Sequence, residues 1–215
     1  MSLLQYVQDN SERLVFLTLQ HLQVVLVSVA IATVIGVGIA AATERLPRAR
    51  TVALSISGTL LTIPSFALFG LMIPIVGLGV LPTVLALTTY AVFPILRNAV
   101  TGLEGVDPGV VDAARGMGMG TWRRLVVVRL PLAWPVILNG IRVATIMVVA
   151  IAAIGAAVRG PGLGELIFRG LSRIGGANAL NEVLSGVLGV VLVALVLDIV
   201  FLVVAKLTTP RGLRV

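Results

Sequence analysis

The stretch Asp112–Pro131, DAARGMGMGTWRRLVVVRLP, is the longest interval in which charge, glycine and helix-start signals come together between apolar runs. It follows Asp107-Pro108, where Asp is a preferred helix N-cap and Pro is tolerated at the first helical position. We expect a short helix over about Pro108–Met117. This helix should end at Gly118 or Gly120, because glycine readily takes the left-handed conformation of a helix C-cap.

A second short helix is expected after this turn. Thr121 can cap it, and Leu130-Pro131 closes it and leads into the next apolar run. The stretch is therefore expected to be a polar loop between two hydrophobic segments. The basic residues that the second helix carries are Arg123, Arg124 and Arg129.

The composition is that of a membrane protein. Of the 215 residues, 58% are hydrophobic and 12% are charged, whereas soluble domains carry about 25% charged residues. The net charge is +7, but the basic residues lie in short segments between apolar runs, so nucleic acid is not an expected partner. The chain has no Cys, and His21 is its only His, which argues against thiolate chemistry and Cys/His metal sites.

We expect an all-α polytopic membrane protein with about five transmembrane helices. The run Thr51–Leu96 contains no charged residue and is too long for one crossing of a ~30 Å hydrocarbon core, so it should cross twice. Pro64 and Pro94 lie inside these two spans and are expected to kink them. One membrane domain is expected over residues 14–206, with a loop at 101–131 and spans at about 20–42, 52–72, 82–100, 132–158 and 183–205.

The first apolar run begins after Arg13 and is too long for the hydrophobic region of a cleaved signal peptide, so we expect it to remain in the membrane. With five spans, Lys and Arg are distributed unequally. One side carries eleven of them: Arg45, Arg48, Arg50, Arg97, Arg115, Arg123, Arg124, Arg129, Lys206, Arg211 and Arg214. The other side carries four: Arg13, Arg159, Arg169 and Arg173. The positive-inside rule then predicts a cytoplasmic 101–131 loop, an outer N-terminus and a cytoplasmic C-terminus.

Two charged residues, Arg142 and Asp198, lie inside the expected spans. A charge in the hydrocarbon is costly, so we predict that the two residues pair and tie the fourth span to the fifth. The alternative is that Arg142 extends to the interface while Asp198 pairs with Lys206 or water. We expect His21 to anchor its helix at the membrane interface rather than to act as a substrate ligand or proton carrier.

The second span is rich in small and hydroxyl-bearing residues. Such residues let helices approach closely and also line polar interiors, and both roles remain open here. The candidates for lining a pathway are Ser57, Thr62, Pro64 and Ser65.

The sequence gives no indication of catalysis by this chain. No phosphate-binding pattern G-x-x-x-x-G-K-[ST] is present, and no nucleophile–base set is available. We therefore expect a non-catalytic membrane subunit that takes its energy from a partner.

The loop resembles the EAA loop of ABC-importer permeases. It reads Asp112-Ala113-Ala114, three residues, Gly118, nine residues, then Val128-Arg129-Leu130-Pro131. Asp replaces Glu and Val replaces Ile, and the spacing is intact. The resemblance implies the type I ABC-importer permease (MetI-like) fold and a cytoplasmic ATPase subunit whose cleft receives the short helix. It assigns this coupling to Asp112, Ala113, Ala114, Gly118, Leu130 and Pro131.

Over about residues 14–206 the chain is similar to the osmoprotectant uptake permeases. This implies a subunit of an ATP-driven importer in the bacterial cell membrane, for a compatible solute such as glycine betaine, choline or carnitine. It also implies a second permease copy or paralogue, an extracytoplasmic binding protein, surrounding lipid, and ATP that is used by the ATPase and by no site in this chain. The supporting segments are Gln20-His21-Leu22, Thr62–Ser65, Pro94–Asn98, Gly140–Arg142 and Gly164–Leu171.

Three alternatives remain open at the level of the sequence. The first is an ABC permease for another small solute, such as an amino acid or a betaine-like thiol compound. The second is a channel or secondary transporter that works without an ATPase. The third is a membrane scaffold with no transport role, which no feature of the sequence favours.

Overall fold

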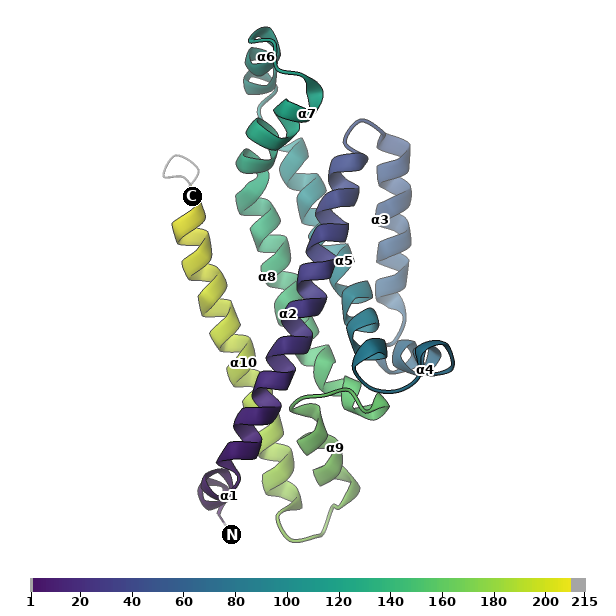
Figure 1. The fold of residues 1–215 in the computed structure, drawn as a ribbon, viewed down its shortest axis with the longest axis vertical. Coiled ribbons are helices and arrows are strands. Elements are labelled where there is room, and N and C mark those ends of the chain that lie inside the picture. Colours follow the sequence, from purple (N-terminus) through teal and green to yellow (C-terminus); the bar gives the residue numbers. More distant parts are fainter. Residues whose placement is uncertain (1, 210–215) are drawn as a thin grey trace.

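The computed structural model describes residues 2–209, and the regular structure in this part of the chain is helical (Figure 1). A π-helical segment, Leu125–Arg129, and a 3₁₀ segment, Gly155–Val158, flank α8. The α-helices are α1 (Leu3–Asp9), α2 (Ser11–Ala42), α3 (Pro47–Thr62), α4 (Ser65–Val76), α5 (Val80–Glu104), α6 (Pro108–Gly116), α7 (Thr121–Arg124), α8 (Leu130–Ile154), α9 (Gly164–Ser172) and α10 (Ala179–Thr208).

Four helical segments within residues 2–209 are long and apolar enough to cross a membrane: α2, α5, the continuous segment Thr121–Val158, and α10. The pair α3 and α4 makes a fifth candidate if it counts as one broken span. The helices extend beyond the apolar runs read from the sequence. For example, α2 begins at Ser11 rather than near residue 20, because a helix need not end where the hydrocarbon ends.

The expected second span, 52–72, is not one kinked helix. The chain breaks at Ile63-Pro64, and α4 turns away from α3 by 98°. Pro64 disfavours a helical conformation in the residue before it, and Ile63 is extended, with φ −65° and ψ 129°. The Ile63 carbonyl accepts a hydrogen bond of 2.7 Å from the Tyr90 hydroxyl. Pro94, by contrast, lies within the continuous helix α5.

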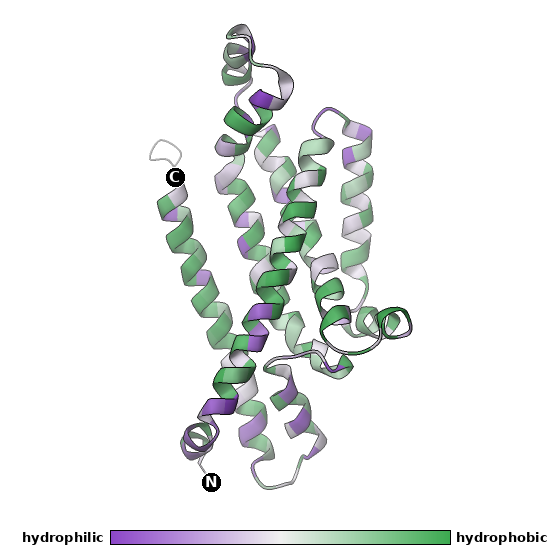
Figure 2. Ribbon diagram, in the orientation of Figure 1, coloured by the Kyte–Doolittle hydropathy of each residue, from purple (hydrophilic) through white to green (hydrophobic). Residues whose placement is uncertain are grey.

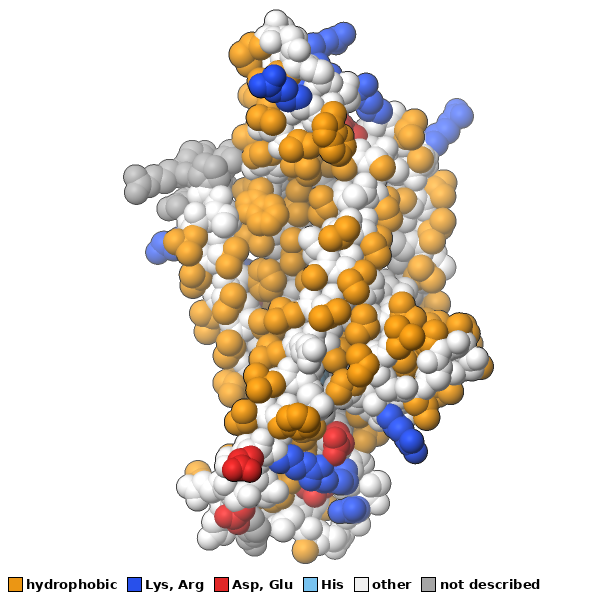
Figure 3. Space-filling view, viewed as in Figure 1, with side chains coloured by type: hydrophobic (Ala, Val, Ile, Leu, Met, Phe, Trp, Pro, Cys, Tyr) orange, Lys and Arg blue, Asp and Glu red, His pale blue; other side chains and the backbone are white. Residues whose placement is uncertain are grey.

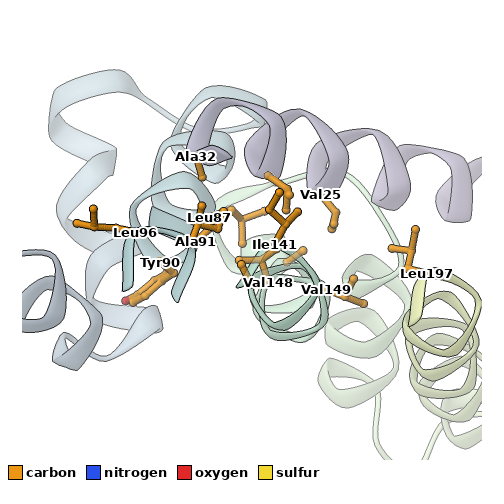
Figure 4. Close-up of a cluster of buried hydrophobic side chains, with 14 of the residues drawn as sticks. Val25, Ala32, Leu87, Tyr90, Ala91, Leu96, Ile141, Val148, Val149 and Leu197 are labelled. Carbon is orange, nitrogen blue, oxygen red and sulfur yellow. The ribbon is translucent and has the colours of Figure 1, made fainter. Parts of the chain in front are cut away.

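Helix α5 lies at the centre of the bundle and packs against α2 and α8. Val25, Leu87, Leu96 and Val148 are among the buried side chains where these helices meet (Figure 4). Small residues allow the close contact: a Cβ atom at Gly140 would lie 2.5 Å from the Cβ of Asn98. The helix backbones therefore approach as they do in membrane bundles.

The outer surface of the bundle is apolar. Figure 2 shows hydrophobic residues along the long helices, and Figure 3 shows Lys, Arg, Asp and Glu mainly at the two ends of the visible face. Helix α10 exposes large side chains such as Leu192, which is 62% exposed. A soluble protein would not leave so large an apolar surface in water, so this belt is the part that faces lipid or another subunit.

Candidate functional site

Helix α6 stands beyond the end of the bundle (Figure 1). The predicted N-cap is confirmed, since the Asp107 carboxylate accepts a 2.7 Å hydrogen bond from the Gly109 N–H. Pro108 is the first helical residue, also as predicted. The helix ends at Gly116 with Met117 as its C-cap. Gly118 follows with φ +79°, in the left-handed region that favours glycine.

The Asp-Ala-Ala segment places its three side chains on different faces of α6. Ala114 is only 2% exposed and faces the protein, whereas Asp112 and Ala113 face outward. The Asp112 carboxylate makes no hydrogen bond or ion pair with any residue in 2–209, and the cap of the helix is Asp107 instead. Ala113 lies between exposed Val110 and Met117, at the spacing of one helix face. The result is a short apolar stripe that points away from the bundle.

The second half of the loop differs from expectation. Thr121 does not cap α7, because Gly120 takes the N-cap position and no side chain caps the helix. The Thr121 hydroxyl instead accepts a 2.7 Å hydrogen bond from the Arg45 guanidinium. Leu130-Pro131 does not close this helix either. Both residues lie in the first turn of α8, and a π-helical segment just before them joins α7 to α8 without a break. Short π-helical segments of this kind are rare and occur mostly as bulges inside α-helices.

Two ion pairs lie at the end of the bundle that carries α6, and each contains one acidic residue. Arg129 donates a 2.7 Å hydrogen bond to the Leu103 carbonyl and also pairs with Glu44, in the turn between α2 and α3. Arg50 and Glu104 lie 2.8 Å apart and join the start of α3 to the end of α5. Sequence reasoning missed these partners. The signal was that Glu44 and Glu104 are the acidic residues flanking this side of the first three spans.

Arg142 and Asp198 lie face to face between α8 and α10. The Arg142 Nε is 2.6 Å from Asp198 Oδ1, and its Nη2 is 2.9 Å from Oδ2. Two parallel N–H···O bonds of this kind fix orientation as well as distance. Both side chains are about one-third exposed on the surface of the chain: the exposed fraction is 32% for Arg142 and 27% for Asp198. The structure thus brings together the two charged residues that the sequence places inside spans.

The candidate lining residues separate into two groups. Ser57 is buried, and its hydroxyl donates to the carbonyls of Ala53 and Leu54 in its own helix, so it does not reach an open surface. Thr62 lies in a groove of about 690 Å³ between α3 and α5. Pro64 and Ser65 lie at the break that follows α3 and do not line this groove. Its lining residues are Thr51, Leu54, Ser55, Gly58, Thr59, Thr62, Phe93 and Arg97.

His21 is buried inside the protein, which differs from the expected anchor at the membrane interface. Its Nε2 lies 3.0 Å from the Val149 carbonyl of α8, and its relative exposure is 0%. A Cβ atom at Gly162 would lie 2.8 Å from His21 Nδ1, so the segment before α9 packs over the ring. The sequence could not show this burial, because it depends on three segments far apart in the chain.

The end of the molecule opposite α6 holds α1 and α9 (Figure 1). Arg13 and Glu165 form an ion pair of 2.5 Å, and Arg169 lies 3.1 Å from Glu182. These pairs tie α9 to the start of α2 and to the start of α10. This end is therefore an ordered surface of short helices and paired charges.

Comparison with solved structures places this fold among ABC-importer permeases. A chain of the MetNI methionine ABC transporter in inward-facing conformations matches with a TM-score of 0.80 and 27% identity, covering 98% of this chain and 100% of that one. A second crystal form of the same transporter also gives a TM-score of 0.80, at 24% identity. The predicted MetI-like, all-α fold is confirmed.

Comparison with known sequences agrees. The osmoprotectant import permease protein OsmW of Salmonella typhimurium is 40% identical over the full length of both chains. The glycine betaine/carnitine/choline transport system permease protein OpuCB of Bacillus subtilis is 32% identical, over 99% of this chain and 96% of its own length. Residues 33–212 match the family model for binding-protein-dependent transport system inner membrane components. This chain therefore belongs to the family of inner membrane components of binding-protein-dependent transport systems.

Proposed function

We propose that this chain is the membrane-spanning permease subunit of an ATP-driven importer for osmoprotectants. The observation that carries the proposal is α6, a capped helix that stands beyond the bundle and presents an outward apolar stripe. An exposed apolar stripe on a helix is suited to a groove on a partner protein. The family and the full-length match to permeases point to the same role.

The substrate class follows from the relatives. Permeases named for osmoprotectants, for choline, and for glycine betaine, carnitine and choline together match almost all of this chain at 32–40% identity. We therefore propose a compatible solute such as glycine betaine, choline or carnitine. An external binding protein would select the solute and deliver it, and this chain would provide the path.

The Lys and Arg distribution supports an orientation with α6 in the cytoplasm, the N-terminus outside and the C-terminus inside. In that orientation an ABC ATPase subunit receives α6, and Asp112 is free to contact a basic residue of the ATPase. The opposite end, with α1 and α9, faces the binding protein. A second permease copy or paralogue completes the path, and ATP is bound and hydrolysed by the ATPase alone.

Movement of the ATPase would reach the bundle through the contacts at the base of the loop. Arg129 links α8 to α5 and to the turn before α3, and Arg45 holds the start of α7. A force that the ATPase exerts on α6 would therefore be transmitted to several spans, and would not only bend the loop that carries α6. Coupling requires that the contact with α6 differ in free energy between the inward-open and outward-open states.

Transport by the purified complex tests the proposal. Proteoliposomes that contain the permease, its ATPase and its binding protein should take up labelled glycine betaine, carnitine or choline only when ATP is enclosed. Gly118→Trp should abolish uptake while the protein still inserts into the membrane. Flux without the ATPase would identify a channel or secondary transporter, and uptake of an amino acid in place of these solutes would refute the proposed substrate class.

A further inference from the structure

The groove between α3 and α5 has a distinct chemical character. Three threonines, Thr51, Thr59 and Thr62, contribute to its wall together with Ser55. Each threonine hydroxyl donates to a carbonyl of its own helix, at distances of 2.7–3.0 Å. Their donors are therefore already used, and the lone pairs of the oxygens remain as the polar groups that the groove can offer.

Gly58 of α3 and Phe93 of α5 meet in the lining of the groove. A Cβ atom at Gly58 would lie 3.1 Å from the Phe93 ring, so the glycine leaves the space that the ring fills. The guanidinium of Arg97, one turn along α5, lies over that ring at 6.0 Å from its centroid. Phe93 thus holds the arginine at the groove wall through a cation–π contact.

Arg97 has no carboxylate partner among the residues that the structure describes. The acid at the end of α5, Glu104, is already paired with Arg50. Arg97 lies seven residues before Glu104, which corresponds to roughly 10 Å along the helix axis. An exposed, unpaired guanidinium beside a row of hydroxyls is unfavourable in hydrocarbon and favourable beside water. This face of α3 and α5 is therefore the part of the bundle best suited to a water-filled path.

We propose that this groove receives the carboxylate of a zwitterionic solute on Arg97. The Thr59 oxygen, which can only accept because its proton is donated within its own helix, then faces the quaternary ammonium end of the same molecule. Glycine betaine and carnitine carry both groups, whereas choline lacks a carboxylate. The inference rests on the proposed transport function and deepens it, because it makes the path itself prefer betaines over choline, separately from any selection by the binding protein.

The absence of cysteine allows a direct test of the groove, independent of the solute. Ser55→Cys gives this chain its single thiol, and labelling is read on this chain in membrane vesicles that contain the assembled transporter. The probes are two membrane-impermeant methanethiosulfonates, one carrying a sulfonate and one a trimethylammonium group. Leu192→Cys on the apolar outer face of α10 is the control and should not react. Thr59→Cys, in the same groove, replaces Ser55→Cys if that variant fails to assemble.

Ser55→Cys should react, and it should favour the anionic reagent roughly tenfold more strongly with Arg97 present than in the Arg97→Gln background, the order expected of one unit charge at a few ångström in water. The matched control Arg115→Gln, on α6 and outside the groove, should leave this preference unchanged. A thiol as unreactive as that of Leu192→Cys would overturn the proposal, because the groove would then face lipid or lie buried against another subunit. A preference that Arg97→Gln does not change would also overturn it.

Uptake by the reconstituted complex tests the choice of substrate. Arg97→Gln should lower glycine betaine and carnitine uptake about tenfold at saturating binding protein and leave choline uptake near wild type, whereas Arg97→Lys should retain part of the betaine uptake. Equal loss of all three solutes, or no loss, contradicts the assignment. If the unaltered complex imports none of the three solutes, the proposed function is refuted. The thiol measurement then still decides whether water fills the groove and whether the groove prefers anions.

Discussion

Replacing Gly118 by Ala adds one methyl group at a residue whose φ is +79°. No atom outside the immediate chain lies within 4 Å of the new Cβ, so a steric clash with neighbouring residues does not explain any effect. The change acts on the backbone alone, because an L-residue in the left-handed region costs about 1–2 kcal/mol relative to glycine. Since about 1.4 kcal/mol corresponds to a factor of ten, the population of the native turn after α6 should fall about 5- to 30-fold.

Because an ATPase would bind only the population in which α6 is correctly presented, its apparent affinity should fall by up to the same factor. Gly118→Asn should lose less, since Asn tolerates the left-handed region. Gly116→Ala is the matched control: its Cβ also meets nothing within 4 Å, but Gly116 is helical, where Ala is the better residue. The measurements are ATPase binding to the permease in detergent and ATP-driven uptake in proteoliposomes. Equal behaviour of Gly118→Ala and Gly116→Ala would refute this account of the turn.

Three further predictions concern contacts that hold the helices of the bundle together and the cap that begins α6. Reversing the charges of Arg142 and Asp198 together should recover the thermal stability that either single reversal loses, measured as the melting temperature in detergent; a double variant no better than the singles would contradict the pairing. Asp107→Ala should destabilise the start of α6 by about 1 kcal/mol through loss of its cap, seen as faster amide exchange in α6 with unchanged exchange in α10. Gly140→Ala should destabilise the bundle by about 1–3 kcal/mol through overpacking against Asn98, and an unchanged melting temperature would refute the close approach of α5 and α8.

The features that the sequence predicted correctly are those with local causes. The start of α6 follows from Asp107 and Pro108, whose capping and fixed φ act within one turn. The helical class follows from the long apolar runs, because a membrane requires each span to satisfy its own backbone hydrogen bonds. The contact between Arg142 and Asp198, 56 residues apart, is not local; it was expected only because leaving either charge alone in hydrocarbon is costly.

Other residues lie in surroundings that the sequence alone could not show. Thr121 has the chemistry of a helix cap, but the Arg45 side chain uses its hydroxyl. Ser57 has the chemistry of a pathway residue, but it faces the protein interior and bonds to its own helix. His21 has the chemistry of an interfacial anchor, but the Val149 carbonyl and the segment at Gly162 enclose it.

The sequence by itself determined that this chain is a helical membrane protein with a capped polar loop, because hydropathy and capping act over a few neighbouring residues. Only the tertiary structure decided how that loop is attached. The packing of α5 against α2 and α8 brings Arg129 to Glu44 and to the Leu103 carbonyl. The approach of Gly58 to Phe93 places Arg97, whose guanidinium lies over that ring, in a hydroxyl-lined groove. These features depend on which helix faces meet, and that choice is made by packing between segments far apart in the chain.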